Sequence, residues 1–282
     1  MGDQYLMFEE DQPIVSAFSF MKEAWIDAGR PGIEDMAYEP QTSARSGGRA
    51  CNAHVVNDEL TVPTSGGSVD TYVAKTTNTV AFLVQSGRTL SSTVLNNLAS
   101  SWDQTIYPTM TTYYGKDYQD GRGLAPPDVD NNCQVQIVIY DIDGAYNIGG
   151  YFAPSMSNSR EALFVDYADV TLSWGKSILA HELEHLLHNA QDPYEKLWID
   201  EGNADVAIYL CFGADSTLIS HLNQWTEASE ISVRWWNQRF ADYGAGFIFT
   251  MYLADHLGGG PAVRQLVQDS ATGGLGVENL AI

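Results

Sequence analysis

Basic residues are scarce in this chain of 282 residues, where 14 lysines and arginines stand against 36 aspartates and glutamates. The formal net charge is −22. A surface of that sign repels the phosphate backbone of nucleic acids and the anionic headgroups of membranes. Nucleic acid is therefore not an expected partner, whereas solubility in water is favoured.

Long hydrophobic runs are missing as well. The longest apolar stretch, Ala245–Ala254, falls well short of the roughly 20 residues that cross a bilayer, so no membrane insertion is expected. The start Met1-Gly2-Asp3-Gln4 lacks the basic and apolar composition of a signal peptide. A mature secreted domain would begin in the same way, and a secreted or cell-surface location is the expectation.

Cysteine is limited to Cys51, Cys133 and Cys211, and the three are too far apart for a thiolate metal site. An odd number leaves at least one thiol unpaired. Cys211 lies in an apolar segment, where a free thiol packs as a small hydrophobic group. Cys51 and Cys133 would pair in an oxidising compartment, and the sequence leaves that pairing open.

Histidine is rare too, yet three of the six histidines lie within eight positions. His181 and His185 are four apart in the segment His-Glu-Leu-Glu-His, and apolar residues recur around them at helical spacing. On a helix both rings project from one face and can bind a single zinc ion. Glu182 is placed to take a proton from a water that the zinc activates. A solvated helical face with two histidines is the alternative.

The segment Trp-Ile-Asp-Glu-Gly at 198–202 offers a third zinc ligand, Glu201. Asp205 lies four residues further along a second predicted helix, so both carboxylates point the same way. Asp205 could accept the free ring N–H of His181 and so fix its tautomer. Acids gathered at an ordinary helix N-terminus are the alternative.

Two neighbours of the motif are not expected to bind this ion. His188 lies roughly 10 Å along the helix axis from His181, which is too far for ligands of one zinc. It is expected to be a pocket-wall, supporting or surface residue. Glu184 projects away from Glu182 and is expected to be structural or solvated.

His181-Glu-Leu-Glu-His185 followed by Trp-Ile-Asp-Glu-Gly resembles the gluzincin metallopeptidases, and more closely the hyicolysin-type secreted bacterial metalloproteases. The likeness covers roughly residues 70–275, although only these two elements are specific to the chemistry. It implies a gluzincin-like catalytic domain, a bound zinc ion and endopeptidase activity on a protein or peptide substrate. It does not identify that substrate.

Peptide hydrolysis also needs a hydrogen-bond donor for the oxyanion. The resemblance implies a tyrosine or a histidine from a downstream segment. Tyr243 is the first choice, because it opens the last long helical run at the place of a similar Tyr-Gly in related enzymes. His221, on the predicted helix Ser216–Trp225, is the second choice. A tyrosine that merely packs at an interface is the alternative.

The chain divides into three parts. Residues 1–50 form an irregular N-terminal segment that ends in the linker Thr42–Gly48. Residues 51–170 alternate β-branched and polar residues and predict a β-rich lobe with one helix near Ser92–Thr111. Residues 171–282 predict a helical lobe that carries the zinc site. The expected fold class is α+β, with a twisted sheet lobe, a mainly helical lobe and the zinc cleft between them. We expect one catalytic domain, cut from a protein with further domains.

Two weaker sites precede the zinc motif. The segment Glu161-Ala162-Leu163-Phe164 could be an edge strand that binds an extended substrate by main-chain pairing, or else a central strand. Asp128, Asp130 and Asn132 offer oxygen atoms at alternate positions, as calcium loops do. The rest of the twelve-residue calcium pattern is missing, so a solvated turn is the alternative to Ca²⁺.

Two other functions stay open. One is an adhesion or binding module that retains a zinc ion without catalysis, although loss of Glu182 would be its expected mark. The other is a zinc hydrolase of an amide that is not a peptide, which would use the same metal chemistry.

Overall fold

The computed structural model describes residues 14–16, 22, 51–119, 121–144, 147–157 and 159–281. Most of the predicted irregular segment 1–50, including the linker Thr42–Gly48, therefore lies outside the described residues. Within it, Ile14–Ser16 form a strand rather than irregular backbone, and Lys22 is helical and buried.

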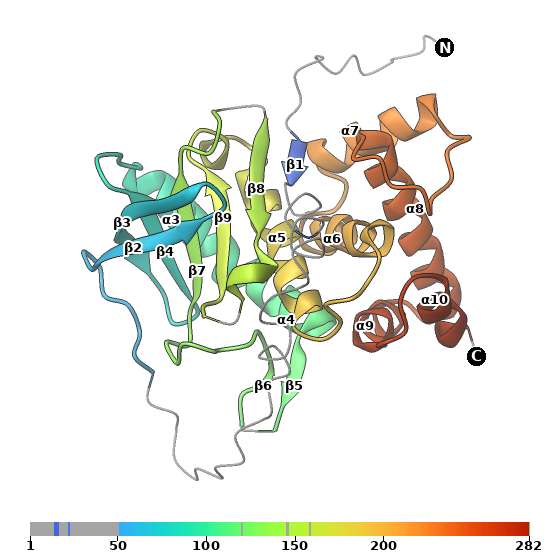
Figure 1. Cartoon of the computed structure of the whole chain (residues 1–282), viewed down its shortest axis with the longest axis horizontal. Helices are drawn as coiled ribbons and strands as arrows, with labels where there is room; N and C mark the ends of the chain where they lie inside the picture. The colour runs from blue at the N-terminus through green and yellow to red at the C-terminus, as the bar shows by residue number, and fades with distance from the viewer. Residues whose placement is uncertain are drawn as a thin grey trace.

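A mixed sheet of seven strands forms one half of the described structure, in the order β1-β8-β9-β7-β4-β3-β2 (Figure 1). Its strands β4, β7 and β9 run parallel to one another and are buried on both faces, as central parallel strands require. The other strands close the sheet on either side. The bounds are β1 Ile14–Ser16, β2 Glu59–Thr64, β3 Gly67–Thr76, β4 Val80–Gln85, β7 Val135–Tyr140, β8 Ile148–Phe152 and β9 Ala162–Asp166.

The predicted edge strand is a central strand, so that prediction is wrong. Ala162 pairs with Gln136 of β7 on one side, and Leu163 pairs with Phe152 of β8 on the other. The backbone of β9 therefore has no free hydrogen-bonding edge. All of its side chains are buried, because helices cover one face of the sheet and a smaller apolar cluster lies on the other.

Helices form the other half (Figure 1). Helices α5 and α6 lie between the sheet and the group α7–α10, and α5 packs on β8 and β9 as well as on α6. This confirms the α+β class, with a sheet followed by a helical region. The bounds are α3 Ser92–Ser101, α4 Tyr107–Tyr114, α5 Gly175–Asn189, α6 Leu197–Phe212, α7 Ser216–Glu227, α8 Phe240–Leu257, α9 Gly260–Gln268 and α10 Gly274–Leu280. A π-helical turn at Trp102–Ile106 joins α3 to α4, and a small hairpin follows (β5 Lys116–Tyr118, β6 Gly123–Ala125).

Helix α5 is enclosed on every side rather than along one stripe. Every residue from Ser177 to Asn189 is buried, the charged ones included. Its leucines pack against β4, β7 and β9 in the main core, while its opposite side faces α6. The polar side chains of α5 must therefore find partners inside the protein, since a buried polar group without one is costly.

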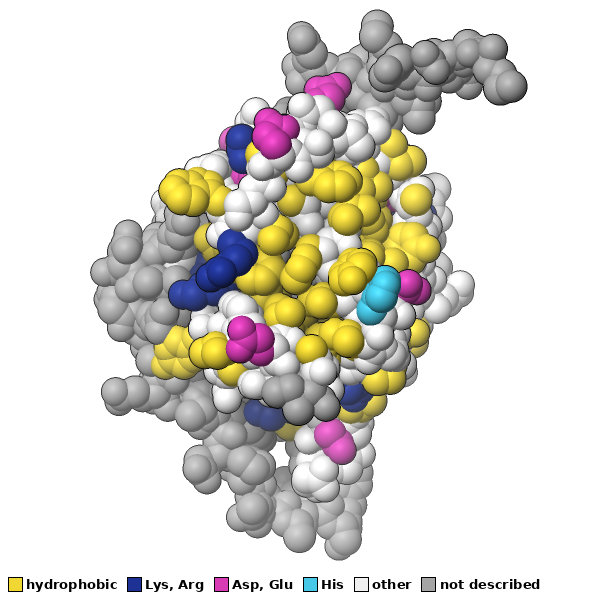
Figure 2. All heavy atoms as spheres, turned by 90° about the vertical axis from the view of Figure 1, so that its right-hand side faces the viewer, with side chains coloured by type: hydrophobic (Ala, Val, Ile, Leu, Met, Phe, Trp, Pro, Cys, Tyr) yellow, Lys and Arg dark blue, Asp and Glu magenta, His cyan; other side chains and the backbone are white. Residues whose placement is uncertain are grey.

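The outer helices present an apolar face. Figure 2 shows hydrophobic side chains gathered on the side of the molecule where α8–α10 lie, with few charged groups among them. Ile248 and Tyr252 of α8 and Leu275 of α10 are exposed there. Within the described residues, no helix is both long and apolar enough to cross a membrane.

Helices α6 and α8 approach each other closely at two glycines. A Cβ added to Gly202 would lie 2.8 Å from the carbonyl oxygen of Gly246 and 2.8 Å from Thr250 Oγ1. A Cβ added to Gly246 would lie 3.0 Å from the carbonyl oxygen of Trp198. The glycine that follows Glu201 therefore allows the two helix backbones to meet.

We expect Gly202→Ala to lower the free energy of unfolding by about 1–3 kcal/mol, the usual cost of overpacking. Alanine favours the helix by about 1 kcal/mol over glycine, so the net loss is smaller than the packing term alone. Urea unfolding measures the change. The matched control is Gly66→Ala, in a turn where nothing lies within 4 Å of the added Cβ. Equal stability of the two variants would contradict the close approach.

Candidate metal centre

Helices α5 and α6 bring His181, His185 and Glu201 together. The Nε2 atom of His181 lies 3.1 Å from Glu201 Oε2, and the Nε2 atom of His185 lies 3.4 Å from the same oxygen. One ligand atom from each of the three residues lies within 4.8 Å of the others, and all three side chains are fully buried. The sequence motifs thus converge on one point of the interior.

Carboxylates also face the opposite nitrogen of each ring. Asp205 Oδ1 lies 3.3 Å from Nδ1 of His181, and Asp200 Oδ1 lies 3.4 Å from Nδ1 of His185. An Nδ1 that faces a carboxylate carries the ring proton, which leaves Nε2 as a metal ligand. Asp205 lies where the sequence places it, whereas the partner of His185 was not foreseen.

The charge balance of the three residues fits a cation. Burial lowers the pKa of His181, but Asp205 and Glu201 more than offset it and raise that pKa well above its usual value. Burial also lowers the pKa of His185, but Glu201 and Asp200 more than offset this effect and raise that pKa to about 9. The surrounding carboxylates therefore favour positive charge at both Nε2 atoms. Two imidazoles and one carboxylate are a ligand set of catalytic zinc, so the residues present fit that ion.

Glu182 is fully buried and lies against strand β8. A Cβ added to Gly150 of β8 would lie 3.5 Å from Glu182 Cγ and 2.6 Å from Ile178 Cγ2. Glycine at this position therefore lets the strand touch the helix turn that carries Glu182. The motif glutamate therefore lies against the sheet, next in sequence to the candidate ligand His181.

Tyr243 and His221 both lie next to the centre. The Tyr243 ring is 6.2 Å from the His181 ring and 4.8 Å from the His221 ring, centroid to centroid. His221 Nδ1 is 2.6 Å from Oδ2 of Asp205, the carboxylate whose other oxygen faces His181. Burial raises the pKa of Asp205, but His221 and His181 lower it to about 2. His221 therefore supports the partner of a ligand.

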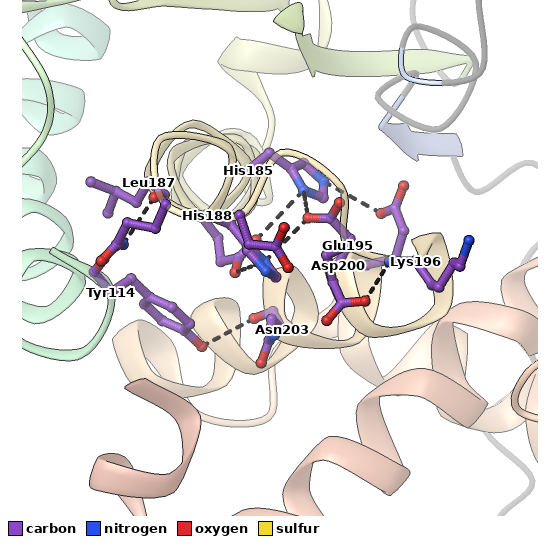
Figure 3. Close-up of polar contacts among 12 residues, drawn as sticks. Tyr114, His185, Leu187, His188, Glu195, Lys196, Asp200 and Asn203 are labelled. Atoms are coloured by element: carbon purple, nitrogen blue, oxygen red, sulfur yellow. Dashed lines mark hydrogen bonds and ion pairs between the residues drawn. The ribbon is translucent and has the colours of Figure 1, made fainter. Parts of the chain in front are cut away.

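Two further side chains of α5 belong to this network, as Figure 3 illustrates at His185, His188 and Asp200. His188 Nδ1 lies 3.1 Å from Glu184 Oε1 and 3.3 Å from Asp200 Oδ1. Both His188 and Glu184 are fully buried, so the surface interpretation of His188 and the solvated interpretation of Glu184 are wrong. The spacing of four between them is the signal that could have predicted their contact.

Lys22 reaches the same network from the N-terminal segment. Its ammonium group forms a buried ion pair with Asp200 Oδ2. A distance of 178 positions separates the two residues, and nothing in the local sequence predicts the contact.

The predicted calcium loop has a different set of oxygen atoms. Asp128 and Asp130 cluster with Glu161, whose carboxylate is buried, and ligand atoms of the three lie within 4.8 Å of one another. Asn132 instead supports the loop: its Oδ1 accepts a hydrogen bond from the Gln134 backbone N–H, and its Nδ2 donates to Asp130 Oδ2. Calcium binding here stays a prediction.

Cys51 and Cys133 form a disulfide with their Cα atoms 5.6 Å apart, which settles the pairing that the sequence left open. The bridge adjoins the Asp128 loop, because the Cys133 backbone N–H donates to Asp128 Oδ1. Cys211 is a half-buried free thiol, and burial raises its pKa to about 12.

Comparison with known proteins finds similarity to a metalloprotease. The chain is 27% identical over 216 residues to the neutral metalloprotease ShpI of Staphylococcus hyicus, an alignment that covers 65% of this chain and 47% of that protein. The chain thus spans about half the length of the curated relative it matches. No protein-family model matches it.

The buried carboxylate of Glu161 gives a testable pH dependence. Burial, and then Asp130 and Asp128, raise its pKa from 4.5 to about 8, although the Val129 backbone N–H opposes them. The folded state therefore retains a proton that the unfolded chain loses. Stability should fall as pH rises from about 4.5 to about 8, with a limiting slope of about 1.4 kcal/mol per pH unit.

We expect the wild type to lose stability relative to Glu161→Gln across this window in calcium-free buffer, as measured by urea unfolding. Added Ca²⁺ should reduce the fall in the wild type, because a cation keeps the carboxylate ionised, and should leave the variant unchanged. Parallel pH profiles of the two proteins would contradict the assignment.

Proposed function

We propose that this chain is a zinc-dependent endopeptidase of the gluzincin type, in which His181, His185 and Glu201 hold the zinc ion. The observation that carries the proposal is the convergence of two imidazole Nε2 atoms on one oxygen of Glu201 in the protein interior. The likeness to a metalloprotease supports the same conclusion. The substrate class is an extended protein or peptide segment.

Glu182 is the general base in this proposal. A zinc ion bound at the centre would polarise the substrate carbonyl and lower the pKa of a water molecule. Glu182 takes one proton from that water while the water oxygen adds to the carbonyl carbon of the substrate. It then donates this proton to the amide nitrogen, so that the C–N bond breaks and a neutral amine leaves. Its place against β8 restricts its orientation.

The carboxylates behind the ligands orient the rings. Asp205 Oδ1 lies 3.3 Å from Nδ1 of His181, and Asp200 Oδ1 accepts the Nδ1–H of His185. Such partners fix the tautomer and increase the basicity of Nε2, and their loss costs about 10- to 100-fold in metal affinity. His221 in turn holds Asp205 through its second oxygen.

Tyr243 is the proposed donor to the oxyanion, with His221 as the second choice. The Tyr243 ring lies beside both His181 and His221 and is buried, so its hydroxyl acts in an environment that excludes most water. A donor of this kind is most effective where the dielectric constant is low.

The expected location is outside the cytosol. The Cys51–Cys133 disulfide supports it, since such bridges persist in oxidising compartments. The apolar face of α8–α10 fits contact with a further domain of a longer chain. The net charge of −22 favours neutral or basic substrate segments.

The decisive test of the proposal is Glu182→Gln. We expect casein cleavage to fall by about 10²- to 10⁴-fold, because the general base is lost. Bound zinc should remain, since the ligands are untouched, while Glu201→Gln should lose zinc and activity together. Metal analysis and a fluorescent casein assay measure both quantities. The matched control is Glu230→Gln, a surface glutamate outside the centre. Full activity in Glu182→Gln would refute the mechanism.

A second test concerns the oxyanion donor. We expect Tyr243→Phe to lower kcat by about 10²- to 10³-fold with little change in KM, because the hydroxyl acts on the charge that develops in the transition state. Bound zinc should be unchanged. Tyr252→Phe, a tyrosine exposed on the same helix, is the control and should keep wild-type kcat. An unchanged kcat in Tyr243→Phe transfers the role to His221.

A further inference from the structure

A second group of ligand-type side chains lies where α5 passes into α6. His188 is at the end of α5, Asp192 is in the turn that follows, and Glu195 lies two residues before the start of α6. One ligand atom from each lies within 4.8 Å of the other two. His188 is fully buried, and Asp192 and Glu195 are each only 2% exposed. None of the three belongs to the proposed catalytic site.

Each side chain is held at one atom and leaves another atom without a hydrogen-bond partner among the described residues. His188 Nδ1 faces Glu184 and Asp200. Asp192 Oδ1 accepts from the Tyr194 backbone N–H, and Glu195 Oε1 accepts from the Gly273 backbone N–H. Three buried atoms of the cluster then have no hydrogen bond to any residue that the structure describes: His188 Nε2, Asp192 Oδ2 and Glu195 Oε2.

Lys22 does not balance the charge of this region. Among the described residues, Asp192 and Glu195 share it with Glu184 and Asp200. These four buried carboxylates lie near one ammonium group, which Asp200 already binds, and near the rings of His185 and His188. Both Asp192 and Glu195 are buried, and a buried carboxylate is costly to ionise without a partner. A bound cation would remove that cost, because buried charges require paired charge or metal coordination.

We propose that His188, Asp192 and Glu195 form a second metal site that binds Zn²⁺. The three atoms without hydrogen bonds supply one imidazole nitrogen and two carboxylate oxygens. Zinc accepts nitrogen and oxygen ligands in a tetrahedral set of four, which leaves one position for water. Calcium prefers six to eight oxygen atoms and suits this set less well.

The site would stabilise the connection between the two helices that carry the catalytic ligands. Its ligands lie at both ends of the turn from α5 to α6, and Glu195 also holds Gly273, next to α10. Glu184 and Asp200 each face the Nδ1 atoms of both His185 and His188. An ion at His188 Nε2 therefore fixes the carboxylates that also orient a proposed catalytic ligand.

Metal stoichiometry tests the site independently of activity. The full chain is equilibrated with buffered Zn²⁺ in the presence of Ca²⁺, and bound metals are quantified by mass spectrometry. We expect two zinc ions per chain in the wild type and one in the double variant Asp192→Asn, Glu195→Gln. We also expect one in Glu201→Gln. The control Asp255→Asn, which removes a carboxylate from the surface of α8, should retain two.

The outcomes separate the two metal sites. One zinc ion in the wild type that is lost in Glu201→Gln and kept in the double variant overturns the second site alone. One zinc ion with the reverse pattern supports the second site and overturns the proposed catalytic one. A calcium ion that the double variant loses overturns the choice of zinc.

Circular dichroism verifies that the variants fold. Should the double variant fail to fold, anomalous diffraction from wild-type crystals above and below the zinc edge decides the question. A peak beside His188 Nε2 supports the site. Its absence, with a peak beside His181 and His185, overturns it.

Discussion

The burial of α5 is the constraint on which the rest of the structure depends. This helix carries three histidines and two glutamates into the interior. The sheet closes that interior on one side and α6 closes it on the other. Polar groups there cannot exchange their partners for water, so each must be paired inside the protein. Asp200 and Asp205 of α6 meet part of this need, because they face the Nδ1 atoms of the three histidines. Some of the carboxylates behind the net charge of −22 therefore lie in the core, where they face imidazole rings.

The pairing has a regular form. Each of the three histidines of α5 turns Nδ1 toward a carboxylate. For His181 and His185 the opposite nitrogen meets Glu201, while for His188 it has no hydrogen-bond partner among the described residues. Because Glu184 and Asp200 each contact two of the rings, a change at one carboxylate affects both ring orientations. Close approach of α8 at Gly202 holds α6 in the position that this arrangement requires.

Local signals were enough to predict the helices of the centre, and they pointed to His181, His185 and Glu201, which lie close together in the structure. Apolar spacing around His181 and His185 gave α5, and Pro193 and Gly213 lie just beyond the ends of α5 and α6. The spacing of four between Glu201 and Asp205 predicted that both carboxylates lie on one face of α6, and both lie near His181.

Non-local contacts explain what the sequence did not predict. The place of β9 depends on β7 and β8 pairing with it from both sides, and sheet order is not encoded within a strand. The uniformly apolar run Ala162–Val165 was nevertheless a sign of a central strand. Glu161, rather than Asn132, is the third member of the carboxylate cluster at the Asp128 loop. It lies there because β9 pairs with β7. The ion pair between Lys22 and Asp200 joins residues that are 178 positions apart, so the local sequence does not predict it.

Strand β8 lies next to the proposed metal centre, and β1 pairs with it as the outer strand of the sheet. Gly150 is paired with Val165 of β9 on one side and with Ser16 of β1 on the other, while its Cα faces the helix turn of Glu182. Six residues after Ser16, Lys22 binds the carboxylate beside Glu201. One N-terminal segment therefore contacts both the strand edge and the network behind the ligands. Because a strand edge pairs with one neighbour at a time, a peptide that adds to β8 must compete with β1. The side of β8 that such a peptide would use is thus paired with a segment far in sequence from His181, His185 and Glu201.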